Sequence, residues 1–143
     1  MAELVTLAPE TLGGLRRRFA FDRRLTKIPG VFNALSQLQR EAGLLVCGPE
    51  TALYRIDGDE IEVTVGVPMD EMFPGFETFD VPGSRAVLHR HRGPFAGLPD
   101  VYPALHAAAA EQGLTPTGLA REAYRIIARD DARNVCDVYL DVE

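Results

Sequence analysis

The sequence contains an internal repeat, and this repeat restricts the fold more than any other feature. A shift of the chain against itself by 70 positions aligns residues 28–56 with residues 98–126 without a gap. Of the 29 aligned pairs, 11 are identical, where unrelated stretches of ordinary composition would share roughly two. Two long copies are too few for a solenoid, so the repeat predicts one domain made of two modules related by a pseudo-twofold axis.

The two copies share one predicted order of elements: strand, helix, strand, strand. Apolar residues at helical spacing predict a helix in each copy, around Val31 and Leu35 in the first and around Leu105 in the second. Gly43 and Gly113 follow these helices, at the position where a left-handed residue ends a helix. The segments whose alternating apolar residues predict strands are residues 12–18, 52–56, 61–67, 85–91, 122–126 and 136–142.

This element order predicts an α+β fold, with an antiparallel or mixed sheet and two main helices packed on one face. The first module is expected over residues 1–68, the second over residues 83–143, and a connection over residues 69–82. The connection is rich in Met and Phe, so it should lie against the rest of the protein. It could be a lid on the shared core or one wall of a ligand cavity, and both readings stay open.

Length and composition limit the domain count, the class of partner and the cellular location that we expect. A chain of 143 residues suits a single domain, and its net charge of −6 argues against general nucleic-acid binding. Cys47 and Cys136 are expected to be reduced, buried thiols. The chain lacks a membrane-spanning run and a secretory signal, so a cytoplasmic location is expected. A local basic cluster is interpreted as a solvated strand and loop face; its residues are Arg16, Arg17, Arg18, Arg23, Arg24 and Lys27.

A difference between the two copies marks the candidate site. Ala52 of the first copy corresponds to Glu122 of the second. Residues two apart on a strand share a face, so Glu122 should lie beside Tyr124, while Arg121 and Arg125 point the other way. A carboxylate in an apolar, aromatic setting is costly to ionise unless a cation or a hydrogen-bond donor is supplied. A cationic ligand with an apolar body could supply that charge, although an exposed Glu beside a Tyr is also common.

Three segments, together with the doubled unit, resemble the GyrI-like family. They are residues 88–95 (LHRHRGPF), 102–105 (YPAL) and 121–124 (REAY). This family supplies small-molecule-binding domains, including the effector-binding parts of AraC-type and multidrug-responsive transcription activators. The resemblance spans essentially the whole chain. It implies two strand-helix-strand-strand modules about a pseudo-twofold axis, and a cleft in which Glu122 meets cationic, often aromatic, ligands and Tyr124 lines the wall.

The chain departs from the family pattern at two positions. Family members often carry a Trp near the place of Ala108, and this chain has no Trp. The alanine run at residues 107–110 is therefore expected to leave a wider or differently shaped cleft. Phe95 stands where a Tyr is common, which removes a hydroxyl donor. No segment is left over for a helix-turn-helix, so a free-standing module without a DNA-binding domain is expected.

Three functions follow as hypotheses. The first is the binding of an amphipathic, cationic or aromatic small molecule between sheet and helices, with Glu122 as charge partner. The alternative is a hydrolase of strained, cyclopropane-bearing natural products, an activity of some GyrI-like relatives, with Glu122, Tyr124 and Tyr102 as catalytic residues. The third is an inhibitor that binds DNA gyrase. The expected ligand-binding residues are Glu122, Tyr124, Tyr54, Phe95, Tyr102, Phe32, Phe76 and His91.

No cofactor and no metal is expected. His89, His91 and His106 lack the spacing of a zinc site, and no Cys pair accompanies them. The expected partner is a small-molecule ligand, with gyrase or a regulator as the protein partner under the alternatives. Neither a membrane nor direct nucleic-acid binding is expected, and the protein should be a monomer or a homodimer.

Overall fold

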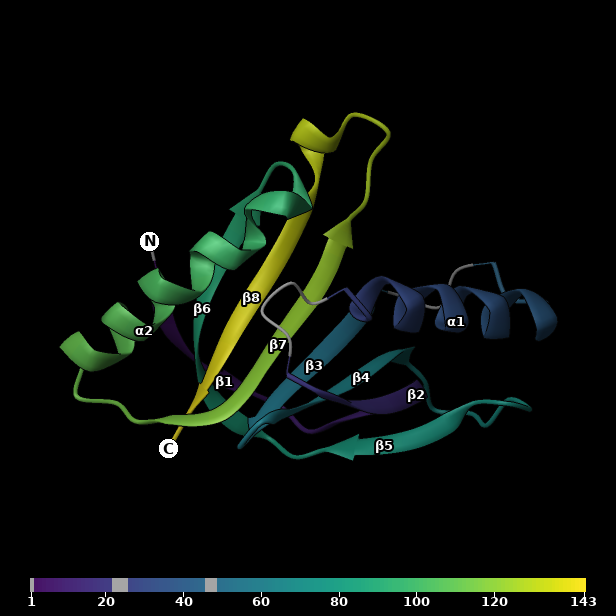
Figure 1. Cartoon of the computed structure of the whole chain (residues 1–143), viewed down its shortest axis with the longest axis horizontal. Helices are drawn as coiled ribbons and strands as arrows, with labels where there is room; N and C mark the ends of the chain where they lie inside the picture. The colour runs from purple at the N-terminus through teal and green to yellow at the C-terminus, as the bar shows by residue number, and fades with distance from the viewer. Residues whose placement is uncertain (1, 22–25, 46–48) are drawn as a thin grey trace.

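The computed structural model describes residues 2–21, 26–45 and 49–143. These residues form one eight-stranded antiparallel sheet and two α-helices (Figure 1). The strands are β1 (Glu3–Leu7), β2 (Glu10–Ala20), β3 (Glu50–Asp57), β4 (Glu60–Pro68), β5 (Glu77–Val81), β6 (Ser84–Arg92), β7 (Pro116–Ile126) and β8 (Val135–Val142). The helices are α1 (Ile28–Glu41) and α2 (Val101–Glu111), and two 3-10 turns are η1 (Phe95–Asp100) and η2 (Asp131–Arg133). The predicted α+β class is confirmed, and all seven strand pairings are antiparallel.

Both helices end just before the glycines that the sequence predicts as their stops. Pro29 lies in the first turn of α1, where a missing backbone N–H removes no hydrogen bond. Gly43 and Gly113 follow α1 and α2 with φ of +72° and +68°. These left-handed residues end the helices, because only glycine adopts that backbone conformation without strain.

The two helices pack on the same face of the sheet. Leu35 of α1 is buried with Val65 of β4, and Leu105 of α2 is buried with Val138 of β8. Val65 and Val138 share a face, because the strand register runs from Val65 through Ala52 and Glu122 to Val138. The sheet therefore carries two apolar cores side by side, one under each helix.

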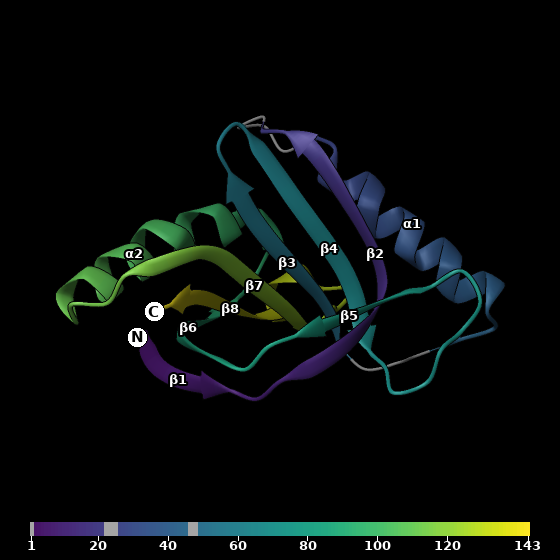
Figure 2. The same cartoon turned by 90° about the horizontal axis from the view of Figure 1, so that it is seen from below.

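The strand order is β1-β6-β8-β7-β3-β4-β2-β5, with β3 and β7 at the centre. Each outermost strand pairs with the half of the sheet opposite to the half that contains the next strand in the chain. β1 precedes β2 in the chain but pairs with β6, and β5 precedes β6 but pairs with β2. The segments that join these strands run along the side of the sheet away from the helices (Figure 2). The chain thus crosses this side before it enters each half.

The segment expected as a connection, residues 69–82, contains a strand that the sequence reasoning did not predict, β5. Before it, Met69 and Phe73 pack against the α1 core, and Phe76 is buried within that core. β1 was also not predicted. Both missed strands have five residues and lie at the outer edges of the sheet, where half of each backbone is unpaired.

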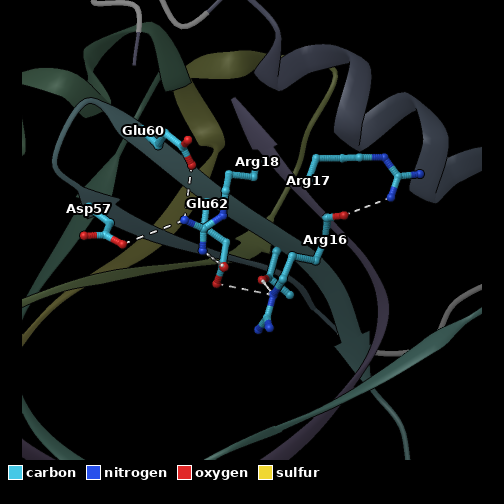
Figure 3. Close-up of polar contacts among 7 residues, drawn as sticks. Arg16, Arg17, Arg18, Asp57, Glu60 and Glu62 are labelled. Carbon is cyan, nitrogen blue, oxygen red and sulfur yellow. Dashed lines mark hydrogen bonds and ion pairs between the residues drawn. The ribbon is translucent and has the colours of Figure 1, made fainter. Parts of the chain in front are cut away.

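Arg16 and Arg18, part of the predicted basic cluster, face carboxylates on the β3–β4 hairpin (Figure 3). Arg18 Nη2 lies 2.8 Å from Glu62 Oε2 and its Nη1 lies 3.2 Å from Glu60 Oε2. Exposed pairs of this kind add little stability, but they neutralise the local charge. The described part of the cluster is therefore a solvated strand face, as expected, whereas Arg23, Arg24 and Cys47 lie outside the described residues. Cys136 is buried.

No helix in the described ranges is both long and apolar enough to cross a membrane. No group of three or more His, Cys, Asp or Glu side chains within those ranges is placed to hold a metal ion.

β2 and β4 approach so closely at Gly14 that no side chain fits there. A Cβ atom on Gly14 would lie 1.9 Å from the Val65 carbonyl oxygen. We expect Gly14→Ala to lower the free energy of unfolding by roughly 1–3 kcal/mol, because the strands must shift apart. Urea denaturation followed by circular dichroism measures this change.

The matched control is Gly30→Ala in α1, where a Cβ atom would meet nothing within 4 Å. This variant should be as stable as the native protein or more stable by up to about 1 kcal/mol, because alanine favours helix over glycine. Equal urea midpoints for Gly14→Ala and the native protein would contradict the close approach of β2 and β4.

Candidate functional site

Glu122 lies in the middle of β7 at the centre of the sheet. Its backbone neighbours are Ala52 on β3 and Val138 on β8, and its side chain is on the face that carries the helices. The residue is only 6 % exposed. Ala52 belongs to the core under α1 and Val138 to the core under α2, so Glu122 lies between the two apolar cores. The prediction that this carboxylate sits in an apolar setting therefore agrees with its position.

Two tyrosine hydroxyls donate hydrogen bonds to the Glu122 carboxylate. Tyr124, two residues along the same strand, donates to Oε1 at 2.5 Å. Tyr102, in the first turn of α2, donates to Oε2. Among the described residues, no Lys, Arg or His forms an ion pair with this carboxylate. The charge is thus held by hydroxyl donors alone.

Tyr124 lies at the meeting point of side chains from both halves of the molecule. Its ring contacts Phe32 of α1 edge-on at 5.5 Å between centroids, and Phe95 of η1 at 5.2 Å. Its hydroxyl oxygen is 3.5 Å from that of Tyr54 on β3. We call Phe32, Tyr54, Phe95, Tyr102 and Tyr124 the aromatic cluster. Each of the five rings is half-buried and keeps some exposed surface.

The environment keeps the cluster hydroxyls protonated. Burial, and then the negative charge of Glu122, raise the pKa of Tyr102 and of Tyr54 above the usual range. Burial, the neighbouring Tyr54 and the charge of Glu122 do the same to the pKa of Tyr124. These phenols therefore remain hydrogen-bond donors at neutral pH.

Six of the eight residues predicted to bind ligand are Glu122 and the five cluster aromatics. The other two lie in different surroundings. Phe76 is buried in the α1 core, where its ring contacts Phe73 edge-on at 6.4 Å. His91 Nε2 lies 2.8 Å from the Pro94 carbonyl oxygen. This contact links the end of β6 to the turn before Phe95, so His91 stabilises the position of Phe95 and is not itself part of the aromatic cluster.

Sequence reasoning missed a second carboxylate on the same face. Glu50 is the direct cross-strand partner of Tyr124. Glu50 is half-buried, and this burial raises its pKa. The signal that could have found it is its position two residues before Ala52, on the same face of the predicted strand.

We expect the charge of Glu122 to be measurable through the tyrosines. The chain has no Trp, so alkaline titration of near-ultraviolet absorbance reports tyrosine ionisation. In Glu122→Gln the negative charge that opposes phenolate formation is gone, so the pKa of Tyr102 and Tyr54 should fall. Circular dichroism at each pH separates ionisation from unfolding.

The matched control for this titration is Glu111→Gln at the exposed end of α2, which should titrate like the native protein. Identical titrations of Glu122→Gln and the native protein would show that the carboxylate does not act on the tyrosines.

Solved structures with the same fold were found. SAV2435 bound to tetraphenylphosphonium is 15 % identical, with a TM-score of 0.81 over 100 % of this chain and 94 % of that one. The EcmrR C-terminal domain is 19 % identical, with a TM-score of 0.71 over 100 % and 97 %. A hydrolase from Listeria innocua is 11 % identical, with a TM-score of 0.60 over 99 % and 91 %. At these identities the likeness establishes the fold alone.

No curated protein matches the sequence. The family model of the GyrI-like small molecule binding domain matches residues 2–143. Since that match spans almost the entire chain, the resemblance seen in the sequence motifs is confirmed, and the protein belongs to the GyrI-like small-molecule-binding domain family.

Proposed function

We propose that this protein binds an amphipathic cation, with Glu122 as the charge partner and the aromatic cluster as the apolar wall. One observation carries the proposal: residue Glu122 is 6 % exposed, and its carboxylate has no basic partner among the described residues. A carboxylate so removed from water gains from a cation that replaces the lost solvation. The ligand supplies that cation.

The surroundings of Glu122 suit such a ligand. Cations are attracted to aromatic faces, and the rings also accept an apolar ligand body. A carboxylate offers about four acceptor positions, and Tyr102 and Tyr124 use two of them. A quaternary cation needs charge rather than a hydrogen bond, so it can approach the remaining carboxylate surface. Tetraphenylphosphonium, the ligand of SAV2435, belongs to this chemical class.

We also infer that the two modules, with boundaries at residues 68 and 83, are related by a pseudo-twofold axis that passes beside Glu122. When a twofold axis relates two antiparallel strands, a residue lies opposite its own counterpart in the other copy only where the axis passes between the strands. Ala52 pairs with Glu122, and these residues are separated by the repeat length of 70. The hydroxyls of Tyr54 and Tyr124, also 70 apart, lie 3.5 Å from one another. Because one copy has Ala52 and the other has Glu122 at this position, a single negative charge lies between the two modules.

Charge matching is tested by calorimetry with tetraphenylphosphonium and with triphenylphosphine oxide, an uncharged molecule of similar shape. In Glu122→Gln we expect the affinity for the phosphonium to fall roughly ten- to hundred-fold, as for loss of a charged partner. The affinity for the phosphine oxide should change little. Glu111→Gln is the control and should bind both compounds like the native protein. Equal losses for both compounds in Glu122→Gln would refute the charge-matching role.

A second candidate, a hydrolase, is favoured by the hydrogen bond from Tyr102 to Glu122. In such a pair the buried carboxylate can act as a general base and the phenol as a general acid. The water oxygen would bond to one carbon of a strained cyclopropane while a water proton passes to Glu122. The C–C bond would break, and its electron pair would pass through a conjugated carbonyl to the carbonyl oxygen, which takes the proton of Tyr102. The proton held by Glu122 would then return Tyr102 to its phenol form.

The hydrolase is tested by incubation with a cyclopropane-bearing alkylating compound and analysis of the products by mass spectrometry. Turnover requires several molecules of ring-opened product per protein, lost in both Glu122→Gln and Tyr102→Phe. Formation of no product beyond the uncatalysed background would exclude the hydrolase while leaving cation binding intact.

A further inference from the structure

A cavity of about 240 Å³ lies on the face of the sheet opposite to the helices. Its floor is formed by the side chains of β7 that point away from Glu122, among them Arg121 and Arg125. Leu7, the last residue of β1, and Pro9, in the segment between β1 and β2 that runs along this side of the sheet (Figure 2), also line the cavity. This cavity is separate from the aromatic cluster, because alternate residues of β7 face opposite sides of the sheet.

Arg121 is an unusual lining residue, because its side chain is only 7 % exposed. Its Nη1 donates a hydrogen bond of 2.9 Å to Glu10 Oε1. Its Nε and Nη2 atoms are buried and have no hydrogen-bond partner among the described residues. A guanidinium is always charged and offers five N–H donors in a planar fork. Buried donors without acceptors destabilise a fold, so this arrangement calls for an additional acceptor.

The charge around the cavity is positive. Arg125 donates to Asp137 at 3.0 Å and to the Tyr139 hydroxyl at 3.2 Å. Asp137 is shared, because Arg90 also binds it through both carboxylate oxygens. The hydrogen bond from Arg90, and after it the one from Arg125, hold the pKa of Asp137 below its usual range. The carboxyl is therefore charged. Three guanidinium groups thus meet two carboxylates, those of Glu10 and Asp137, which leaves one positive charge in excess.

Besides Thr51 and Tyr139, the remaining lining residues are apolar. They include Leu7, Pro9, Pro68 and Ala123. A ligand here must combine an acceptor group with a small apolar body. The volume of the cavity is below the range of typical drug-sized sites, and suits a molecule of about ten non-hydrogen atoms.

We propose that this cavity binds a small apolar carboxylate, whose oxygens accept hydrogen bonds from the unpaired nitrogens of Arg121 and whose apolar body lies against Leu7, Pro9 and Pro68. A planar carboxylate matches the guanidinium fork. Glu10 holds the opposite side of the same guanidinium and orients it. The protein therefore has two sites of opposite charge preference, one on each face of β7.

The test uses benzoate and its uncharged analogue benzamide, with binding measured by calorimetry and by the shift of the Arg121 Nε–H signal in NMR spectra. We expect benzoate to bind the native protein at least about ten-fold more tightly than benzamide, as for a charged hydrogen-bond partner. Its affinity should fall with added salt. In Arg121→Gln the preference for benzoate should disappear.

Two further variants keep the test informative. Glu10→Gln removes the negative charge that offsets Arg121, while the amide oxygen can still accept the hydrogen bond from Nη1 and orient the guanidinium. It should therefore increase benzoate affinity, and it provides a readout if Arg121→Gln does not fold. Glu122→Gln should bind benzoate like the native protein, which separates this proposal from cation binding on the other face. Absence of benzoate binding to the native protein, equal binding of benzamide, or an unmoved Arg121 Nε–H signal would overturn the proposal.

Discussion

The antiparallel pairing of β3 with β7 is the constraint on which the rest of the structure depends. It joins the four strands under α1 to the four under α2 in a single sheet. Its register sets Ala52 opposite Glu122. A carboxylate at this place lies between two apolar cores, with aromatic side chains arriving from both helical sides. A shift of one residue would turn Glu122 to the opposite face and empty the site.

β7 carries two buried charges that cannot neutralise each other. Arg121 and Glu122 are adjacent in sequence but lie on opposite faces, so the sheet separates them. Each charge must find its own partners. The Glu122 carboxylate accepts hydrogen bonds from tyrosine hydroxyls, and Arg121 donates to Glu10, while two of its nitrogens have no partner among the residues that the structure describes. This partial compensation on each face supports the two proposals, a cation site beside Glu122 and a carboxylate site beside Arg121.

Much of this arrangement could be predicted from the sequence, because it follows from local pattern. Helical spacing located α1 and α2, and the difference between Ala52 and Glu122 drew attention to the buried carboxylate that we propose as the charge partner. The edge strands β1 and β5 were missed, because their pairing depends on partners far away in the chain. The bond from Tyr102 to Glu122 depends on how α2 packs on the sheet. The cavity at Arg121 depends on where the β1–β2 segment crosses, which no local spacing encodes.

The most direct test of the central claim, that Glu122 is the charge partner of a bound cation, is a crystal structure of the protein with tetraphenylphosphonium. We predict that the phosphonium lies beside the Glu122 carboxylate, with phenyl groups within about 6 Å of ring centroids of the aromatic cluster. A cation seated elsewhere, with Tyr102 and Tyr124 still hydrogen-bonded to an otherwise unaltered Glu122, would contradict it.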